Sequence, residues 1–125
     1  MTITIIRDQV SGIIYKQREI VLLTFPYSDL SSTKKRPALI VSNNNYNERF
    51  NDVVVCVITS NLFKDDFSIE LENADLDYGI LPEESVVKIH KLFTIDKSKI
   101  IKKFSIVGIE YFNGVIKILT DLFKV

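Results

Sequence analysis

Apolar residues along the chain gather in short runs that polar, turn-forming segments separate. Strands are predicted over residues 19–25 (EIVLLTF), 37–42 and 53–58. The last two runs are apolar without interruption, which indicates burial on both faces, as in the middle of a curled sheet or small barrel. The segments 26–35 and 43–52 are rich in turn formers and amides and are predicted as loops.

The second half of the chain adds two strands and a helix. Residues 67–71 alternate and suit an edge strand, and residues 85–95 form another strand. Asp96 is expected to cap a short helix that runs through Lys103. Near the C-terminus, Asn113-Gly114 is a hairpin signal, but the helical spacing of the apolar residues favours a helix. These are Ile109, Phe112, Ile116, Leu119 and Phe123. The predicted class is mainly β (α+β), an antiparallel barrel with a helix packed on it.

The length of 125 residues indicates one domain, and 46% hydrophobic residues supply its core. The formal net charge is zero, so bulk electrostatics do not favour nucleic acid. The charge is uneven, however: residues 65–84 carry eight acidic residues and no Lys or Arg, whereas residues 34–36 are all basic. A second lysine cluster, over residues 97–103, is expected to be a solvated surface. A neutral protein can still carry a local positive site.

Several classes of protein and site are not expected. Arg7 and Asp8 interrupt the N-terminal segment too early for a signal peptide, and no apolar run is long enough to cross a membrane. The single cysteine, Cys56, cannot form a disulfide within the chain, which suits a cytoplasmic protein. It lies in the run VVVCVI and is expected to be a buried hydrophobe. One His, one Cys and no ligand-spaced carboxylates predict no metal site.

A basic residue and two hydroxyls are predicted to meet at one rim of the sheet. The strands 37–42 and 53–58 are joined by about ten residues, too few for a helical crossover, so they should pair antiparallel. That pairing brings Arg36 close to Thr59 and Ser60. Because Arg36 precedes a proline, its backbone is held extended. A planar guanidinium placed in this way can bind a phosphate through two donors.

Three segments resemble the MazF/PemK-like toxins of bacterial and archaeal toxin–antitoxin systems. They are residues 19–43 (EIVLLTFPYSDLSSTKKRPALIVSN), 53–60 (VVVCVITS) and 85–100 (SVVKIHKLFTIDKSKI). The resemblance covers residues 19 to 123 and implies a small SH3-like β-barrel with a C-terminal helix. It also implies a homodimeric endoribonuclease that cuts single-stranded RNA at short sequences, needs no cofactor or metal, and is neutralised by a cognate antitoxin.

The resemblance also implies the site. The essential arginine of the family falls on Arg36, the essential threonine on Thr59, and Ser60 matches the hydroxyl that often follows. The implied reaction is attack of the 2′-hydroxyl of the RNA on the adjacent phosphate. Arg18 and Glu19 stand where the family commonly has Gly-Asp, so the turn beside the groove is open to change. Residues 1–18 are an N-terminal extension, expected to pack on the single domain of residues 19–125.

Five further residues are expected to bind RNA. Two are basic and would attract phosphate, and three are loop aromatics that would stack on unpaired bases. They are Lys34, Lys35, Tyr27, Tyr46 and Phe50. The general base stays open, because arginine is a poor proton acceptor. His90 is one candidate, and strand alternation sends Lys91 to the opposite face.

Two other functions fit the same pattern. One is an inactive barrel that only binds an antitoxin or RNA. The other is a gyrase poison of the CcdB type, a group that uses a tryptophan near its C-terminus. This chain has no tryptophan and ends in LFKV, which disfavours the second alternative.

Overall fold

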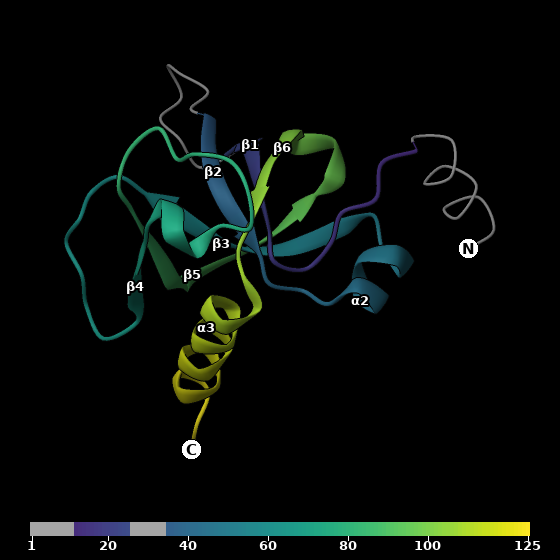
Figure 1. Ribbon diagram of the computed structural model, residues 1–125. Helices are drawn as coiled ribbons and strands as arrows, with labels where there is room; N and C mark the ends of the chain where they lie inside the picture. The colour runs from purple at the N-terminus through teal and green to yellow at the C-terminus, as the bar shows by residue number, and fades with distance from the viewer. Residues whose placement is uncertain (1–11, 26–34) are drawn as a thin grey trace.

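The computed structural model describes residues 12–25 and 35–125, which form one six-stranded sheet and a C-terminal helix (Figure 1). The strands are β1 Glu19–Thr24, β2 Lys35–Ile40, β3 Asp52–Thr59, β4 Ser68–Leu71, β5 Ser85–Asp96 and β6 Ile100–Ile106. The helices are α2 Asn44–Arg49 and α3 Ile109–Leu122, with short 3₁₀ turns η1 Asn73–Asp75 and η2 Lys97–Lys99.

All ladders of the sheet are antiparallel, in the order β4-β5-β3-β2-β1-β6. The edge strands β4 and β6 share no ladder within the described ranges, so the sheet curls without closing; a single bridge joins Leu76 to Val107. The prediction of a mainly β, antiparallel fold with a C-terminal helix is confirmed. What differs is that the barrel stays open.

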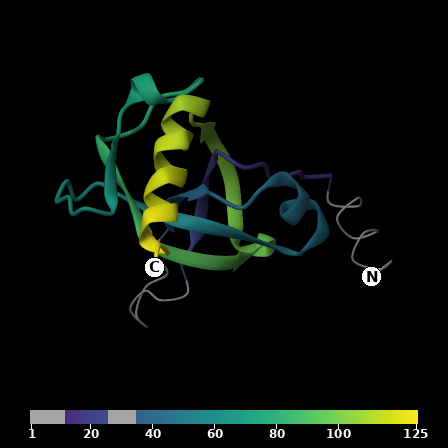
Figure 2. The ribbon, with the colours of Figure 1, turned by 90° about the horizontal axis from the view of Figure 1, so that it is seen from below.

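The curled sheet buries both of its faces, as the continuous apolar runs predict. On one face, Cys56, Ile58 and Ile89 pack against Phe112 and Val115 of α3. Figure 2 shows α3 crossing in front of the strands on this side. On the other face, a second cluster fills the inside of the curl. Its members include Val21, Leu23, Ala38, Ile40, Val53, Val55 and Ile95. Side chains that alternate along a single strand therefore pack into two different cores.

Strand β5 pairs with both ends of β3, but the pairing is interrupted in the middle. Val57 pairs with Lys88, but its neighbour Cys56 pairs with Leu92, so residues 89–91 are inserted at this point. Such an insertion bends a strand and increases its twist. The first half of β5 pairs with β4 as well as β3, and the bend carries the second half around the curl.

Two expectations about local structure are wrong. The segment 43–52 is not all loop, because Asn43 caps the helix α2 by accepting a hydrogen bond from the Tyr46 N–H at 2.8 Å. Asp96 does act as a cap, but the helix it begins is only the 3₁₀ turn η2. Residues 100–106 then form β6 and pair with β1. Tertiary pairing of these β-branched and aromatic residues outweighs the local helix signal.

Arg18 keeps the backbone geometry that a glycine would provide. Its φ is +80°, in the left-handed region. Its N–H donates to the Ile40 carbonyl and its carbonyl accepts from the Val107 N–H, both at 3.0 Å. The guanidinium also donates to the Val107 carbonyl at 2.6 Å and lies 3.7 Å from Asp77. These contacts hold an arginine in a conformation that is strained for any residue with a Cβ.

The residues just before β1 pack against the rest of the chain. Tyr15 is buried with the cluster inside the curl, and the side-chain amide of Gln17 donates to the Val41 carbonyl at 2.8 Å. Glu19 is 7% exposed and pairs with Lys103 at 3.1 Å. Residues 1–11 lie outside the described part, and the boundary at residue 18 stays a prediction. Within the described ranges, no helix has the length and apolar character needed to span a membrane.

We predict that Arg18→Gly is more stable than Arg18→Ala. Both substitutions remove the guanidinium contacts, but only alanine keeps the left-handed penalty, which is about 1 kcal/mol. Urea unfolding of the two variants, compared with each other, measures this difference directly. Equal free energies of unfolding would show that position 18 carries no backbone strain.

Cys56 should be inert to thiol reagents in the folded protein. It is fully buried, and burial raises the pKa of its thiol to about 12, so almost no reactive thiolate exists at pH 8. Ellman's reagent should leave the native protein unlabelled and should label it fully in guanidinium chloride. Rapid labelling under native conditions would contradict this burial.

Candidate active site

The register of β2 and β3 confirms the antiparallel pairing that the sequence predicts. Ala38 lies opposite Val57, Leu39 opposite Cys56 and Ile40 opposite Val55. Arg36 is two residues before Ala38, and Thr59 is two residues after Val57. The same register, continued to the ends of the strands, sets Arg36 opposite Thr59. Both side chains are half-buried at the rim of the sheet.

Strand alternation adds a second cation to this face. Directly opposed residues of an antiparallel pair share a face, as do residues two apart on one strand. Val57 opposes Lys88 of β5 as well as Ala38 of β2. Arg36, Thr59 and Lys88 therefore lie on one face of the sheet, which we call the arginine face.

The polar groups of Arg36 and Thr59 are placed to receive an anion. Within the part of the chain that the structure describes, the Arg36 guanidinium forms no hydrogen bond or ion pair. The Thr59 hydroxyl oxygen accepts a hydrogen bond from the Asn61 N–H at 3.1 Å. Since one lone pair of this oxygen is occupied, its own proton remains to be donated. A guanidinium and a hydroxyl donor thus face the same space.

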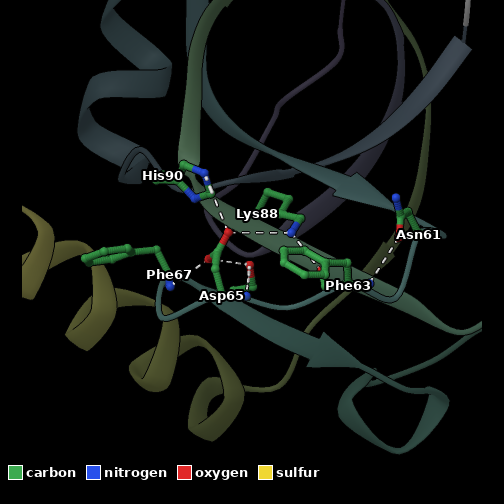
Figure 3. Close-up of polar contacts among 7 residues, drawn as sticks. Asn61, Phe63, Asp65, Phe67, Lys88 and His90 are labelled. Carbon is green, nitrogen blue, oxygen red and sulfur yellow. Dashed lines mark hydrogen bonds and ion pairs between the residues drawn. The ribbon is translucent and has the colours of Figure 1, made fainter.

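Lys88 is held by the loop that follows β3 (Figure 3). Its ammonium donates to the Phe63 carbonyl at 2.8 Å and lies 5.3 Å from the centre of the Phe63 ring. It also lies 3.7 Å from the Asp65 carboxylate, and its side chain is only 15% exposed. Loop 61–67 therefore contacts both residues. Asn61 binds the Thr59 hydroxyl, and Phe63 and Asp65 bind the Lys88 ammonium.

Asp65 anchors this loop and is the acidic centre of the network in Figure 3. It accepts hydrogen bonds from the Ser68 hydroxyl at 2.8 Å and from the Phe67 N–H at 2.9 Å. The Ser68 bond is the main reason that the pKa of Asp65 is below its usual value, followed by the Phe67 bond and the electrostatic influence of Lys88 and of the His90 ring. His90 Nε2 lies 4.0 Å from the carboxylate, and its ring meets Phe67 edge-on.

A cavity of about 530 Å³ opens at the same end of β2 and β3. By alternation, Pro37, Ile58 and Ser60 point to the face opposite Arg36 and Thr59. We call this the cavity face. The lining comprises Leu22, Lys35, Arg36, Pro37, Ile58, Thr59, Ser60, Leu81, Pro82, Glu83, Ser85, Lys102 and Phe104. Every residue at this rim that the sequence singled out and the structure describes, namely Lys35, Arg36, Thr59 and Ser60, contributes to it.

The loop aromatics lie elsewhere. Tyr46 stacks on Phe50 with ring centres 4.7 Å apart, and its hydroxyl donates to Asp52 at 2.6 Å, which raises the pKa of Tyr46. Asp52 begins β3 and Thr59 ends it, so these aromatics are about 20 Å from Thr59 along the strand. Their part in RNA binding stays a prediction, and Tyr27 and Lys34 fall outside the described residues.

Arg18 does not approach the Arg36 site. It precedes β1, whereas Arg36 pairs with Leu23 near the other end of that strand. Its guanidinium is directed to Val107 and Asp77, and it does not line the cavity. Arg18 therefore does not obstruct the cavity beside Arg36.

Three residues of the site were missed by sequence reasoning. Lys88 joins the arginine face, and Lys102 and Glu83 line the cavity. The alternation in SVVKIHK gave a usable signal for Lys88, because it puts this side chain on the opposite face of the strand from its buried neighbour Val87. Lys102 belongs to the lysine cluster of residues 97–103, which was expected only to be a solvated surface, and it reaches the cavity through the pairing of β6 with β1. Among the described residues, no three His, Cys, Asp or Glu side chains gather as a metal site requires.

The Asp65 network predicts a carboxyl that titrates below its ordinary pKa of 3.8. Because the folded pKa is depressed, the carboxylate stabilises the fold above about pH 4, and this stabilisation is lost as the pH falls through the folded value. Ser68→Ala removes the main hydrogen bond and should raise the titration midpoint toward 3.8, as measured by NMR of the side-chain carboxyl carbon. An unchanged midpoint in Ser68→Ala would assign the shift to another cause.

Several solved structures share this fold. One is an endoribonuclease in complex with its cognate antitoxin from a mycobacterial species, at 20% identity over 86% of this chain and 92% of that one, with a TM-score of 0.70. Another is MazF from Deinococcus radiodurans, at 21% identity over 88% of this chain and 96% of that one, also with a TM-score of 0.70. A third, the Mycobacterium tuberculosis toxin MazF-mt6, is 17% identical over 85% of this chain and 96% of that one, with a TM-score of 0.70.

Comparison with curated proteins finds no match. The family model of the PemK-like, MazF-like toxins of type II toxin–antitoxin systems matches residues 16–123, which is most of the chain. The match contains β1 to β6, the Arg36–Thr59 pair and the whole of α3. The chain therefore belongs to the PemK/MazF-like toxin family.

Proposed function

We propose that the protein is a metal-independent endoribonuclease toxin that cleaves single-stranded RNA at specific sequences and is neutralised by a cognate antitoxin. The observation that carries the proposal is the placement of Arg36 opposite Thr59 on one face of the sheet, in a chain of this family. The similar structures include proteins described as endoribonucleases, one of them in complex with its antitoxin.

The proposed reaction uses a nucleophile that the RNA itself carries. The 2′-hydroxyl loses its proton and its oxygen attacks the adjacent phosphorus, forming a 2′,3′-cyclic phosphate. The bond from phosphorus to the 5′-oxygen breaks, and that oxygen takes up a proton and leaves as a hydroxyl. DNA lacks the 2′-hydroxyl and should not be cut.

The residues of the arginine face fit the charges of this reaction. Negative charge grows on the non-bridging phosphate oxygens, where the Arg36 guanidinium can bind two of them. The Thr59 hydroxyl, whose lone pair already accepts from Asn61, donates its proton to a phosphate oxygen and holds the phosphate in line. Ser60 offers a second hydroxyl at the rim, whereas the charge of Lys88 on the same face is already paired with Asp65.

The proposal extends to partners and place of action. The MazE–MazF structure of Deinococcus radiodurans is similar to this chain, and an antitoxin is the partner we propose here. We also propose a homodimer, in which the exposed Ile109 and Ile116 of α3, and Phe123 just after it, would be covered. The proposed substrate places the protein in the cytoplasm.

Removing the proposed site should abolish cleavage without unfolding the protein. Arg36→Ala and Thr59→Ala should each lower the cleavage rate by about 10²–10³, because each removes a donor to the developing phosphate charge. Cleavage of a single-stranded RNA library, with and without a chelator, measures this. Lys117→Ala, an exposed charge removed from α3, is the control and should cut at the wild-type rate.

Three outcomes would contradict the proposal. Undiminished cleavage by both site variants would show that Arg36 and Thr59 take no part in the reaction. Binding of RNA without strand scission by the wild-type protein would instead identify an inactive barrel. Inhibition of DNA gyrase without RNA cleavage would identify a topoisomerase poison.

A further inference from the structure

The cavity has features that the cleavage chemistry does not use. Arg36 and Thr59, which carry the proposed cleavage chemistry, contribute to its lining, but its floor lies on the opposite face of the same strands by strand alternation. This floor is apolar: Leu22, Pro37 and Ile58 come from β1, β2 and β3, and Phe104 comes from β6. The volume of about 530 Å³ is in the range of sites that hold small organic groups.

Two unpaired charges stand at the edge of this apolar floor. Glu83 lies on the segment before β5, and Lys102 lies opposite Leu22 in the β1–β6 ladder. Within the described residues, neither side chain forms a hydrogen bond or ion pair, and the two do not pair with each other. The Ser85 hydroxyl donates to the Glu83 carbonyl at 3.0 Å, and Ser85 is 8% exposed, so the segment that carries Glu83 is anchored.

The cavity is continuous with the proposed cleavage site. Ser60 lines the cavity and directly follows Thr59, and Lys35 lines it and directly precedes Arg36. Neighbouring strand residues are about 3.3 Å apart and point to opposite faces. An RNA strand whose phosphate sits between Arg36 and Thr59 therefore needs to pass only the end of the sheet for its next nucleotide to reach the cavity.

We propose that this cavity binds the base of a nucleotide next to the cleaved phosphate and that Glu83 selects guanine there. The inference rests on the proposed function. An apolar floor with an aromatic ring, Phe104, suits the face of a base. Lys102 at the rim neutralises the phosphate of the bound nucleotide.

The choice of guanine follows from the donors that each base offers a carboxylate. Guanine presents two adjacent donors, N1–H and the N2 amino group, which match the two oxygens of Glu83 in a bidentate pair. Cytosine and adenine each place a ring acceptor beside their amino group, which repels a carboxylate. Uracil has one N–H between two carbonyl oxygens. Glu83 therefore favours guanine over the other three bases.

Cleavage of a degenerate RNA library, with the cut sites read by sequencing, tests the base preference. The wild-type protein should show guanine at one position next to the cut. Glu83→Gln should reduce kcat/KM for those sites by about 10- to 100-fold and lose the preference at that position alone, since a bidentate contact to a base is worth about 1–3 kcal/mol. The neighbouring Glu84→Gln, which removes a charge outside the cavity lining, should keep the guanine preference. No guanine preference in the wild type, or the same preference in Glu83→Gln, would overturn the inference.

A binding measurement separates this inference from the proposed cleavage. Oligonucleotides with 2′-O-methyl groups cannot be cut, and replacing guanine by inosine removes only the N2 amino group. Fluorescence anisotropy should show weaker binding of the inosine strand to the wild type and no such difference for Glu83→Gln. If cleavage fails but this difference remains, the base pocket stands and the proposed function falls. If cleavage depends on Arg36 but inosine binds as well as guanine, the base pocket falls.

Discussion

The alignment of β2, β3 and β5 is the constraint on which the candidate site depends. With Ala38, Val57 and Lys88 in one row across the three strands, Arg36 and Thr59 fall on the same face as Lys88. A slip of one residue between β2 and β3 would send Arg36 to the cavity face and bury its charge among apolar side chains. The two cores prevent that slip, because each strand fills both of them in alternation.

Because of the same alternation, the two faces of the sheet carry different kinds of side chain. One face carries the guanidinium, the hydroxyl and the ammonium, and loop 61–67 connects the last two through Asn61, Phe63 and Asp65. The other face carries an apolar hollow with unpaired charges at its edge. Because both open at the end of β2 and β3, the phosphate contacts and the base contacts that we propose would lie on adjoining faces of the same strands.

The departure of Arg18 from the glycine of the family shows how a local rule can be overridden. A left-handed backbone favours glycine, yet this arginine takes φ +80° and is held by backbone and guanidinium bonds to Ile40 and Val107. The turn into β1 is thus preserved by contacts from distant strands. Arg36 pairs with Leu23 near the other end of β1, and Arg18 does not line the cavity, so its contacts bear on stability.

By itself, the sequence determined the strands rich in β-branched residues, the antiparallel neighbours β2 and β3, the helical C-terminus, and hence the meeting of Arg36 with Thr59. These follow from periodicity and from a connection too short for a crossover. Tertiary structure decided the rest. The segment expected to continue the helix after Asp96 became β6 because β1 had an open edge to pair with, and that pairing brought Lys102 to the cavity. The three residues inserted in β5 allowed Lys88 to join the site. Such placements depend on partners far away in the chain, which local patterns do not encode.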